Sequence, residues 1–340
     1  MRLEAFDFSV PESLIAQQPC EPREAARLLC VDQEGFHDYR LLDLPGLMHP
    51  SDLLLVNTTQ VLPARLYGWR DGVAVEITLL NPVGKSAEES LWSALGRPGK
   101  RLRVGDRLMF AEAFTAEVQA KNGAELTLAF EPQGAAFTAL LERYGTMPLP
   151  PYIKRPRGGD QRDRAAYQSI FARDRGAVAA PTASLHITPT LLQALDARGI
   201  RRAEVTLHVG LGTFAPVTVA DSRDHIMHQE WCRLPPSTAA AIAETKAQGG
   251  RVIALGTTAL RTVETYGGKA GEGETRLFLQ PGDSFRVVDG LITNFHLPRS
   301  TLFMLVAALM GLDRMQAAYQ HAIEQQYRFF SYGDASLLLP

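Results

Sequence analysis

Cysteine is scarce in this 340-residue chain. The three cysteines, Cys20, Cys30 and Cys232, lie far apart, and none belongs to a C-x-x-C pair. An odd and scattered set of this kind indicates neither a disulfide framework nor a cysteine-ligated zinc site. We therefore expect a protein of a reducing compartment.

Long apolar runs are also missing from the sequence. The longest of them, residues 302–311, has about half of the roughly 20 residues that a membrane-spanning helix needs. Near the N-terminus, Glu4 and Asp7 lie where a signal peptide would have its apolar core. The sequence therefore predicts a cytoplasmic protein with no membrane association.

The chain also lacks a large excess of charge of either sign. The chain has 35 Lys and Arg against 37 Asp and Glu, which gives a formal net charge of -2. With 46% hydrophobic and 21% charged residues, its composition is that of a folded globular protein. A nucleic acid would have to bind a local basic patch, because the chain as a whole is not a polycation.

Two patterns of hydrophobicity divide the chain. Strand-like segments at 27–31 and 52–56, together with a short helix expected at 11–17, begin an α/β pattern, and the run at 52–56 is typical of a strand buried on both faces. Between 63 and 148, short alternating segments separated by Gly, Asn and Asp turns are typical of a small β-barrel. Helices and strands alternate again after a proline-rich stretch at 147–159.

These patterns predict an α/β fold, with a larger mixed α/β domain and an inserted small β-barrel domain. The expected bounds are 1–62 plus 149–340 for the discontinuous α/β domain and 63–148 for the barrel. The apolar C-terminal tail is expected to dock as a final strand, because a free terminus of that composition would be poorly ordered.

Polar clusters follow the apolar strands, at the ends where α/β proteins place their sites. They comprise residues 176–187, 207–217, 225–230, 254–264 and 292–304, together with the tail 328–340. Neither a G-x-G-x-x-G fingerprint nor a G-x-x-x-x-G-K-[ST] loop is present. The glycines of "VGLGTF" could bring backbone amides close to a ligand, although on the residues alone a tight structural turn is favoured.

Two further clusters allow both a functional and a structural interpretation. Thr257 or Thr258 could cap a helix. The free amides of its first turn, with Arg261 one turn further on, would suit a carboxylate or a ribose hydroxyl. A purely structural cap is at least as common for a pair of threonines. Asn294 and His296 could address a base edge, or they could serve turn chemistry.

Histidines gather around 225–230, where His225, His228 and Glu230 lie close together, with His208 upstream. Their spacing matches neither H-E-x-x-H nor a zinc-finger pattern. Acid–base or hydrogen-bonding roles are therefore favoured over metal binding.

Basic residues cluster in two stretches. Residues 97–107 hold five positive charges against one aspartate, and residues 154–175 hold seven against three. Such clusters can neutralise a phosphate backbone, with Tyr152 and Tyr167 near enough for stacking, or they can be an ordinary solvated surface. The candidate RNA-binding residues are Arg97, Lys100, Arg101, Arg103, Lys154, Arg155 and Arg157.

Taken together, the motifs resemble the S-adenosylmethionine:tRNA ribosyltransferase-isomerase family of queuosine biosynthesis. The likeness runs essentially end to end, and its longest parts are "VLPARL", "MPLPPYI", "GAVAAPTA", "TLHVGLGTFAPV", "RVIALGTT", "TNFHLP" and "RFFSYGDA". It implies an α/β portion with an inserted β-barrel. It also implies transfer and isomerisation of the ribosyl moiety of S-adenosylmethionine onto the 7-aminomethyl-7-deazaguanine base at the tRNA wobble position, with adenine and methionine released.

The resemblance implies partners and roles. We expect tRNA and S-adenosylmethionine as substrates, no metal, no tightly bound cofactor and a monomer. His208, His228 and Glu230 would transfer protons, while Asp334 would face the sulfonium or the amine. Thr257, Thr258 and Arg261 would hold the methionine carboxylate. Asn294 and His296 would contact a base. Arg65 would bind a phosphate or anchor the inserted domain. The other expected substrate-binding residues are Thr182, His186, Gly210, Thr213, Ser331, Tyr332 and Gly333.

Five positions depart from the family pattern. They are Gln60, where a basic residue is usual, Ser184 for Gly, Ile187 for Phe, Ala259 for Ser and Ser336 for Met. Two other functions remain open on the residues alone. One is a non-catalytic RNA-binding relative, and the other is a metal-dependent hydrolase built on His208, His225 and His228.

Overall fold

A computed structural model of the chain describes residues 1–83, 90–210 and 217–340. Contacts between Cα atoms divide the chain into two compact units. The first is Met1–Gln60, Gln168–Asp174 and Ala180–Pro340, and the second is Val61–Tyr167 with Arg175–Ala179. The domain boundaries expected from the sequence stay a prediction.

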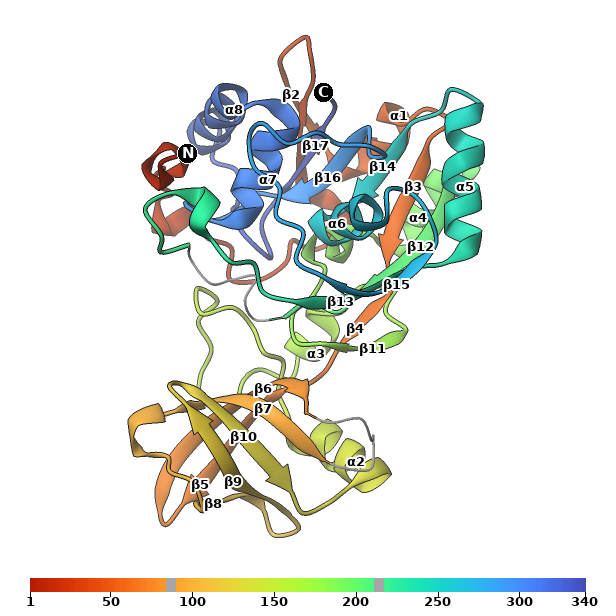
Figure 1. Ribbon diagram of the computed structural model, residues 1–340. Helices are drawn as coiled ribbons and strands as arrows, with labels where there is room; N and C mark the ends of the chain where they lie inside the picture. Colours follow the sequence, from red (N-terminus) through yellow and green to blue (C-terminus); the bar gives the residue numbers. More distant parts are fainter. Residues whose placement is uncertain (84–89, 211–216) are drawn as a thin grey trace. The chain divides into compact units, whose positions relative to one another are not determined.

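The first unit is built on a nine-stranded sheet with the order β15-β13-β12-β3-β14-β16-β17-β1-β2 (Figure 1). Its strands are β1 (Arg27–Val31), β2 (Phe36–Arg40), β3 (Leu53–Asn57), β12 (Arg201–Leu207), β13 (Glu230–Leu234), β14 (Val252–Leu255), β15 (Gly271–Thr275), β16 (Gly290–Asn294) and β17 (Ala335–Leu338).

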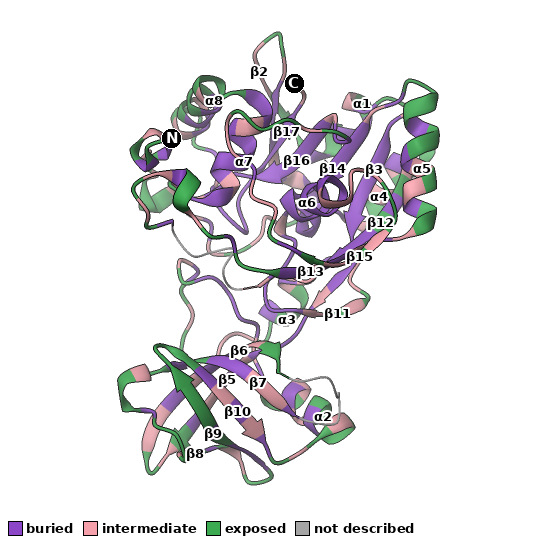
Figure 2. Cartoon of the chain, in the orientation of Figure 1, coloured by how far each residue is buried: buried purple, intermediate pink, exposed green. Residues whose placement is uncertain are grey.

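Four central strands of this sheet, β12, β3, β14 and β16, are parallel neighbours. Every residue of β3 is buried, as its continuous apolar run predicts, and Figure 2 shows the central strands as buried. Because the four strands run the same way, the residues that follow Asn57, Leu207, Leu255 and Asn294 meet at one edge.

Helices cover both faces of the sheet. They are α1 (Leu44–Leu47), α4 (Pro189–Ala197), α5 (Pro236–Ala247), α6 (Thr257–Tyr266), α7 (Thr301–Met310) and α8 (Leu312–Glu324). On one face Leu191 and Leu195 of α4 join a buried cluster with Leu54, Val56 and Ile253. On the other face α6 packs against β12, β3 and β14 (Figure 1). Each such buried aliphatic side chain contributes roughly 1.5–3 kcal/mol.

The expected helix at 11–17 is wrong. Only one 3-10 turn, Glu12–Leu14, forms there, and the chain continues extended at Ile15. Ile15 makes a parallel bridge with Phe329, whose backbone N–H donates to the Leu14 carbonyl over 2.8 Å. Tertiary pairing with the C-terminal segment therefore overrides local helix propensity.

The C-terminal tail docks as the sequence predicts. Its strand β17 is fully buried, antiparallel to β16 and parallel to β1. The turn that leads into it is tight, because a Cβ on Gly333 would lie only 2.4 Å from the Arg328 carbonyl oxygen. Only glycine fits that position.

The second unit holds a closed barrel with the strand order β10-β7-β6-β5-β8-β9. Its interior includes Phe114, Phe130 and Phe137, whose rings pack with centroids 4.9–6.1 Å apart. The predicted fold class, α/β with a β-barrel, is thus confirmed. The elements are β5 (Arg65–Arg70), β6 (Val73–Pro82), β7 (Leu91–Arg97), β8 (Arg107–Ala111), β9 (Phe114–Asn122), β10 (Glu125–Phe130), α2 (Gly134–Tyr144) and α3 (Asp163–Ala166).

A separate two-stranded sheet pairs β4 (Thr59–Val61) with β11 (Asp174–Ala177). Among the described residues, no single helix has the length and apolar character to cross a bilayer. The pair α7 and α8, bent by 113°, passes that test jointly, on length and composition only.

Candidate functional site

A small cavity lies at the carboxyl edge of the parallel strands of the first unit. It is lined by Ala180, Pro181, Thr182, Ala183, Val209, Gly256, Thr257, Thr258, Thr293, His296 and Leu302. Four of the polar clusters in the sequence therefore contribute to one hollow. Its volume is about 30 Å³, enough to hold ordered water.

The start of α6 forms one wall of this cavity. Gly256 precedes the helix with a φ of +90°, a conformation that side chains rarely adopt. The expected capping by a threonine side chain is wrong, since Thr257 and Thr258 lie inside the first turn and no side chain caps the helix. Instead, the Thr258 hydroxyl accepts a hydrogen bond of 3.0 Å from the Asn57 amide.

Arg261 and Glu230 form a buried ion pair behind that wall. Their side chains are only 3% and 2% exposed, and Nη1 of the arginine contacts Oε2 of the glutamate. Glu230 also accepts a hydrogen bond of 2.9 Å from the backbone N–H of Gly210, and Arg261 donates through Nε to the Leu277 carbonyl. In the described part of the chain, Nη2 of Arg261 is buried and has no hydrogen-bond partner.

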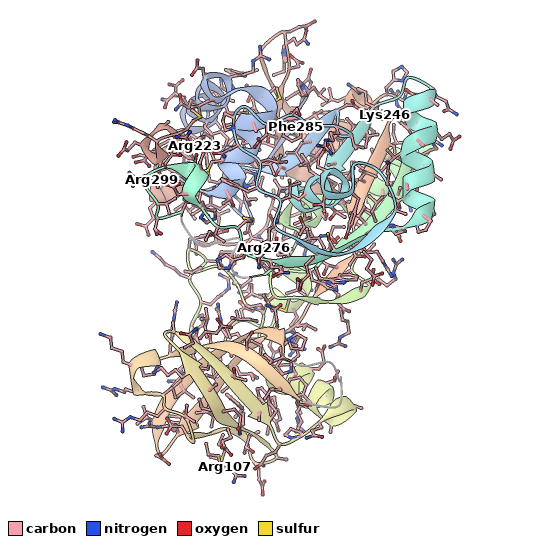
Figure 3. The ribbon with its side chains drawn as sticks, in the orientation of Figure 1. Arg107, Arg223, Lys246, Arg276, Phe285 and Arg299 are labelled. Carbon is pink, nitrogen blue, oxygen red and sulfur yellow. The ribbon has the colours of Figure 1, made fainter. Side chains whose placement is uncertain are left out.

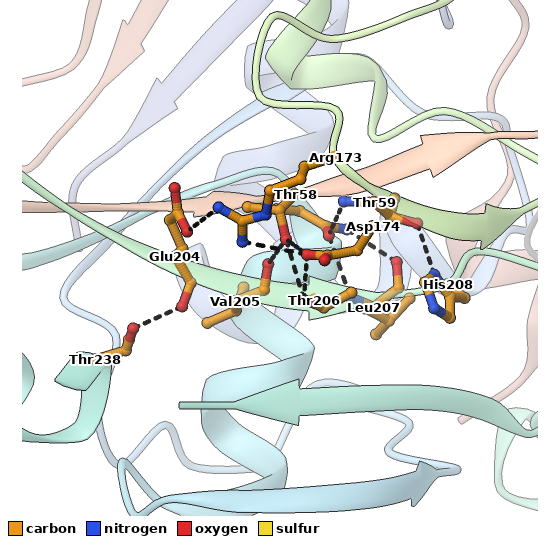
Figure 4. A network of polar contacts seen from close by, with 11 residues as sticks. Thr58, Thr59, Arg173, Asp174, Glu204, Val205, Thr206, Leu207, His208 and Thr238 are labelled. Atoms are coloured by element: carbon orange, nitrogen blue, oxygen red, sulfur yellow. Dashed lines mark hydrogen bonds and ion pairs between the residues drawn. The ribbon is translucent and has the colours of Figure 1, made fainter. Parts of the chain in front are cut away.

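His208 lies directly after β12 and is half-buried. Its Nδ1 lies 2.8 Å from the Thr59 hydroxyl (Figure 4), and its ring stacks on Trp231 with the centroids 5.0 Å apart. Burial lowers the pKa of His208, and the negative charge of Asp174 only partly opposes that shift. The imidazole is therefore neutral near pH 7, as a general base must be.

A polar network joins the ends of β3 and β12 beside this histidine (Figure 4). Asp174 accepts hydrogen bonds from the hydroxyls of Thr58 and Thr206, at 2.6 and 3.2 Å. The side-chain amide of Asn57 donates a hydrogen bond to the Leu207 carbonyl, and its Oδ1 accepts hydrogen bonds from the backbone N–H groups of Leu207 and Thr59. Sequence reasoning missed Thr59, although a polar triplet directly after a fully buried strand was a usable signal.

Two other histidines among the expected site residues, His186 and His296, are buried. Burial lowers the pKa of His186 to about 4, helped by the charges of Arg23 and Arg328, and that of His296 to about 3. Nε2 of His296 lies 3.0 Å from the Thr293 hydroxyl, and its backbone N–H donates to the Tyr319 hydroxyl. Both rings are therefore neutral hydrogen-bonding groups.

Asn294, at the end of β16, joins His186 to the C-terminal segment. Its Nδ2 lies 3.2 Å from Nε2 of His186 and 3.2 Å from the Phe330 carbonyl oxygen. Its Oδ1 is buried, with no hydrogen-bond partner among the described residues. Contact with a base, which stays a prediction, would have to use this oxygen.

Asp334 is buried, and its two carboxylate oxygens accept hydrogen bonds from the backbone N–H groups of Arg27 and Arg328, at 3.0 and 2.7 Å. Burial raises the pKa of Asp334, although the two amides and the nearby arginines oppose that shift. These contacts favour a positioning role over direct contact with substrate. Ser331 and Tyr332 are buried beside it.

The remaining expected residues are distributed as follows. His228 is exposed, whereas His225 is partly buried against Phe278. Thr213 lies outside the described residues. Within the described ranges, no three His, Cys, Asp or Glu side chains group as metal ligands would, so His208, His225 and His228 do not form a ligand set.

Residues expected to bind RNA lie in the second unit, and most are exposed, namely Arg97, Lys100, Arg101, Arg103, Lys154 and Arg157. Arg155 instead makes a bidentate ion pair with the buried Asp163, with both contacts at 2.8 Å. Stacking of a base on Tyr167 is excluded because that ring is fully buried. Arg65 donates to the Leu149 carbonyl over 2.9 Å, which ties segments of this unit together.

The family departures are accommodated. Ser184 is buried without a positive φ, so no special backbone angle is lost there. Ile187 joins the core, Ala259 is buried in α6, and Ser336 donates to the Thr293 carbonyl over 3.2 Å. Gln60 is partly exposed.

Comparison with known proteins agrees across the whole chain. A family model described as "Queuosine biosynthesis protein" matches residues 3–338. The S-adenosylmethionine:tRNA ribosyltransferase-isomerase of Rhodospirillum rubrum is 54% identical, over 99% of this chain and 98% of its own. That of Maricaulis maris is 51% identical over 99% of each chain. A crystal structure of S-adenosylmethionine tRNA ribosyltransferase from Thermotoga maritima has a TM-score of 0.56 at 34% identity, covering 98% of this chain and 100% of that one.

Proposed function

The chain belongs to the queuosine biosynthesis protein family, and we propose that it is an S-adenosylmethionine:tRNA ribosyltransferase-isomerase. It transfers and isomerises the ribosyl moiety of S-adenosylmethionine onto the 7-aminomethyl-7-deazaguanine base at the tRNA wobble position. The products are epoxyqueuosine-tRNA, adenine and methionine. This proposal rests on sequence identities of 54% and 51%, over 99% of this chain, with relatives of that name.

The reaction begins with acidity that the substrate itself supplies. The positive sulfur of S-adenosylmethionine acidifies the neighbouring C5′ hydrogens, so a neutral base can remove one of them. His208 suits this role because burial keeps it unprotonated and Thr59 fixes its ring. Adenine then leaves as the amine of the tRNA base attacks the ribose. An oxygen of the former ribose displaces methionine, which departs with its sulfur as the C5′–S bond breaks, and the epoxide forms.

The start of α6 suits the methionine end of the co-substrate. Amides in the first turn of a helix lack partners within the helix and attract a carboxylate. Thr257 lines the cavity at that turn, and Nη2 of Arg261 is the one atom of its guanidinium that the described contacts leave for a ligand. We assign the methionine carboxylate to this wall.

Glu230 and Asp334 act in this proposal by holding other groups. Glu230 engages Arg261 and the Gly210 amide, while Asp334 engages two backbone amides, so neither has an oxygen directed only at the cavity. His228, which is exposed, is available for the proton transfers that the tRNA amine requires. We further propose that the enzyme acts in the cytoplasm as a monomer, with S-adenosylmethionine as co-substrate.

The test is adenine release from S-adenosylmethionine in the presence of tRNA that carries the aminomethyl-deazaguanine base. We expect release with that tRNA and none with tRNA carrying guanine at the same position. S-adenosylhomocysteine is the matched control: its sulfur is neutral, so its C5′ hydrogens are not acidified and no adenine should appear. Binding of tRNA without any adenine release would favour a non-catalytic relative, and methyl transfer to RNA would contradict the proposal.

A further inference from the structure

The outer face of the barrel carries two aromatic side chains on β5, one partly buried and one exposed. Side chains alternate across a strand, and here Leu66 and Gly68 face inward while Tyr67 and Trp69 face outward. Trp69 is 51% exposed, and its register partner across β8 is Met109, which is 50% exposed. A large apolar side chain left this open on a sheet face commonly marks an interaction site.

A cation lies over these rings. The guanidinium carbon of Arg157 lies 5.4 Å from the centroid of Trp69 and 6.0 Å from that of Tyr67. Both distances are within the range of cation–π attraction. Within the described residues Arg157 forms no ion pair with a carboxylate, so its charge remains available to a ligand.

Positive charge continues along the same face. Glu76 on β6 lies opposite Tyr67 on β5 and, on its other side, opposite Arg97 on β7. Arg97 is therefore two strand spacings, or about 10 Å, from Tyr67. The carboxylate of Glu76 lies 3.6 Å from Nε of Arg65, which offsets its charge. Figure 3 shows Arg107 at the outer surface of the barrel, where an ion pair with Glu131 offsets its charge.

The two units differ in net charge. The second unit has sixteen Lys and Arg against twelve Asp and Glu, whereas the first has nineteen against twenty-five. The net charge of the whole chain therefore hides a cationic unit. A polyanion is attracted to that unit and repelled by the rest.

We propose that Tyr67, Trp69, Met109 and Arg157, here called the Trp69 platform, bind an unpaired nucleobase of the tRNA substrate by stacking. Unpaired bases stack on aromatic rings and arginine planes in proteins that bind RNA loops. Arg157 and Arg97 contact the adjoining phosphates. The choice of tRNA as the partner rests on the proposed function, whereas the platform itself rests on the geometry and charge of the barrel.

The first test measures binding of labelled tRNA carrying the precursor base. We expect Trp69→Ala to weaken binding roughly 5- to 100-fold, as loss of one base–aromatic stack does elsewhere. Trp69→Phe keeps an aromatic face and should retain most of the affinity. In steady-state assays the KM for tRNA should rise for Trp69→Ala, with kcat at saturating tRNA unchanged.

Matched controls separate stacking from general surface effects. Tyr39→Ala removes an exposed aromatic side chain from β2 of the first unit and should leave tRNA affinity unchanged. Arg157→Gln should lower the salt dependence of binding by about one phosphate contact. Equal affinity of Trp69→Ala and wild type for tRNA would overturn the platform.

A contact between protein copies would give a different result. If Trp69→Ala changes the oligomeric state by light scattering but not the affinity for tRNA, the patch is a protein interface and the proposal is wrong. If the wild type binds tRNA through Trp69 but releases no adenine, the platform stands and the proposed function fails. If adenine is released and Trp69→Ala leaves the KM for tRNA unchanged, only the platform fails.

Discussion

The hydroxyl of Thr59 lies 2.8 Å from Nδ1 of His208. Thr59 comes two residues after the end of β3, and His208 comes directly after β12, so a residue beyond one strand fixes the imidazole beyond the other. Trp231 holds the same ring from its face. With Nδ1 engaged, Nε2 is the ring nitrogen left to meet a substrate proton. The two parallel strands thereby set both the position and the orientation of the base.

Thr59→Val keeps the shape of the side chain and removes the hydroxyl. We expect kcat to fall roughly tenfold to hundredfold, because a misplaced catalytic group loses about that much, while the KM for S-adenosylmethionine changes little. Thr59→Ser should restore most of the rate, since it restores the oxygen. An unchanged kcat in Thr59→Val would show that the contact does not position the base.

Acid should destabilise the fold through its two buried histidines. The pKa of His186 is about 4 and that of His296 about 3 in the folded chain, below the ordinary 6.5. The unfolded chain therefore takes up these protons first as the pH falls, and their contribution to stability is complete only above about pH 6.5. The free energy of unfolding should fall by up to roughly 1.4 kcal/mol per pH unit for each histidine.

Urea unfolding at pH 7, 6 and 5 measures this loss. His296→Gln removes one of the two groups, so the dependence on pH should decrease by about one proton. A free energy of unfolding that is the same at pH 7 and pH 5 would contradict the expectation.

The buried pair of Glu230 and Arg261 should respond asymmetrically to substitution. Glu230→Leu alone leaves a buried charge without its partner and is expected to cost roughly 3–5 kcal/mol. The double variant Glu230→Leu with Arg261→Met removes both charges and should unfold at a free energy closer to that of the wild type. Additive losses in the double-mutant cycle would show that the two side chains do not act as a pair.

Asp334 distinguishes a positioning role from direct catalysis. Asp334→Ala leaves two buried backbone N–H groups without acceptors, at a cost of roughly 1–3 kcal/mol each. We therefore expect activity and melting temperature to fall together. His208→Ala, by contrast, should abolish turnover at nearly unchanged melting temperature. Loss of activity in Asp334→Ala without loss of stability would favour contact with the substrate.

Much of the scaffold could be predicted from local patterns. Three segments show their environment in their own residues: the apolar run of β3, the alternation of barrel strand β10 and the capped start of α4. The C-terminal strand was equally readable, because an apolar terminus must be buried somewhere.

Relationships between distant segments could not be predicted in this way. The contact of Thr59 with His208 joins residues 149 positions apart, and Arg157 meets Trp69 across 88 positions. Tyr167 was misjudged for a related reason: it lies in a stretch of sequence rich in charged residues, while its surroundings in space bury it completely. Sequence reasoning located the clusters; the pairing of strands decides which members of them meet.

The place of β17 between β16 and β1 has a consequence for biosynthesis. β17 comes much later in the sequence than the hairpin of β1 and β2, yet in the strand order of the sheet the hairpin reaches the central strands through β17. A chain that stops before Ala335 lacks the strand that joins this hairpin to the centre of the sheet. Synthesis must therefore pass β17 before the hairpin can be incorporated.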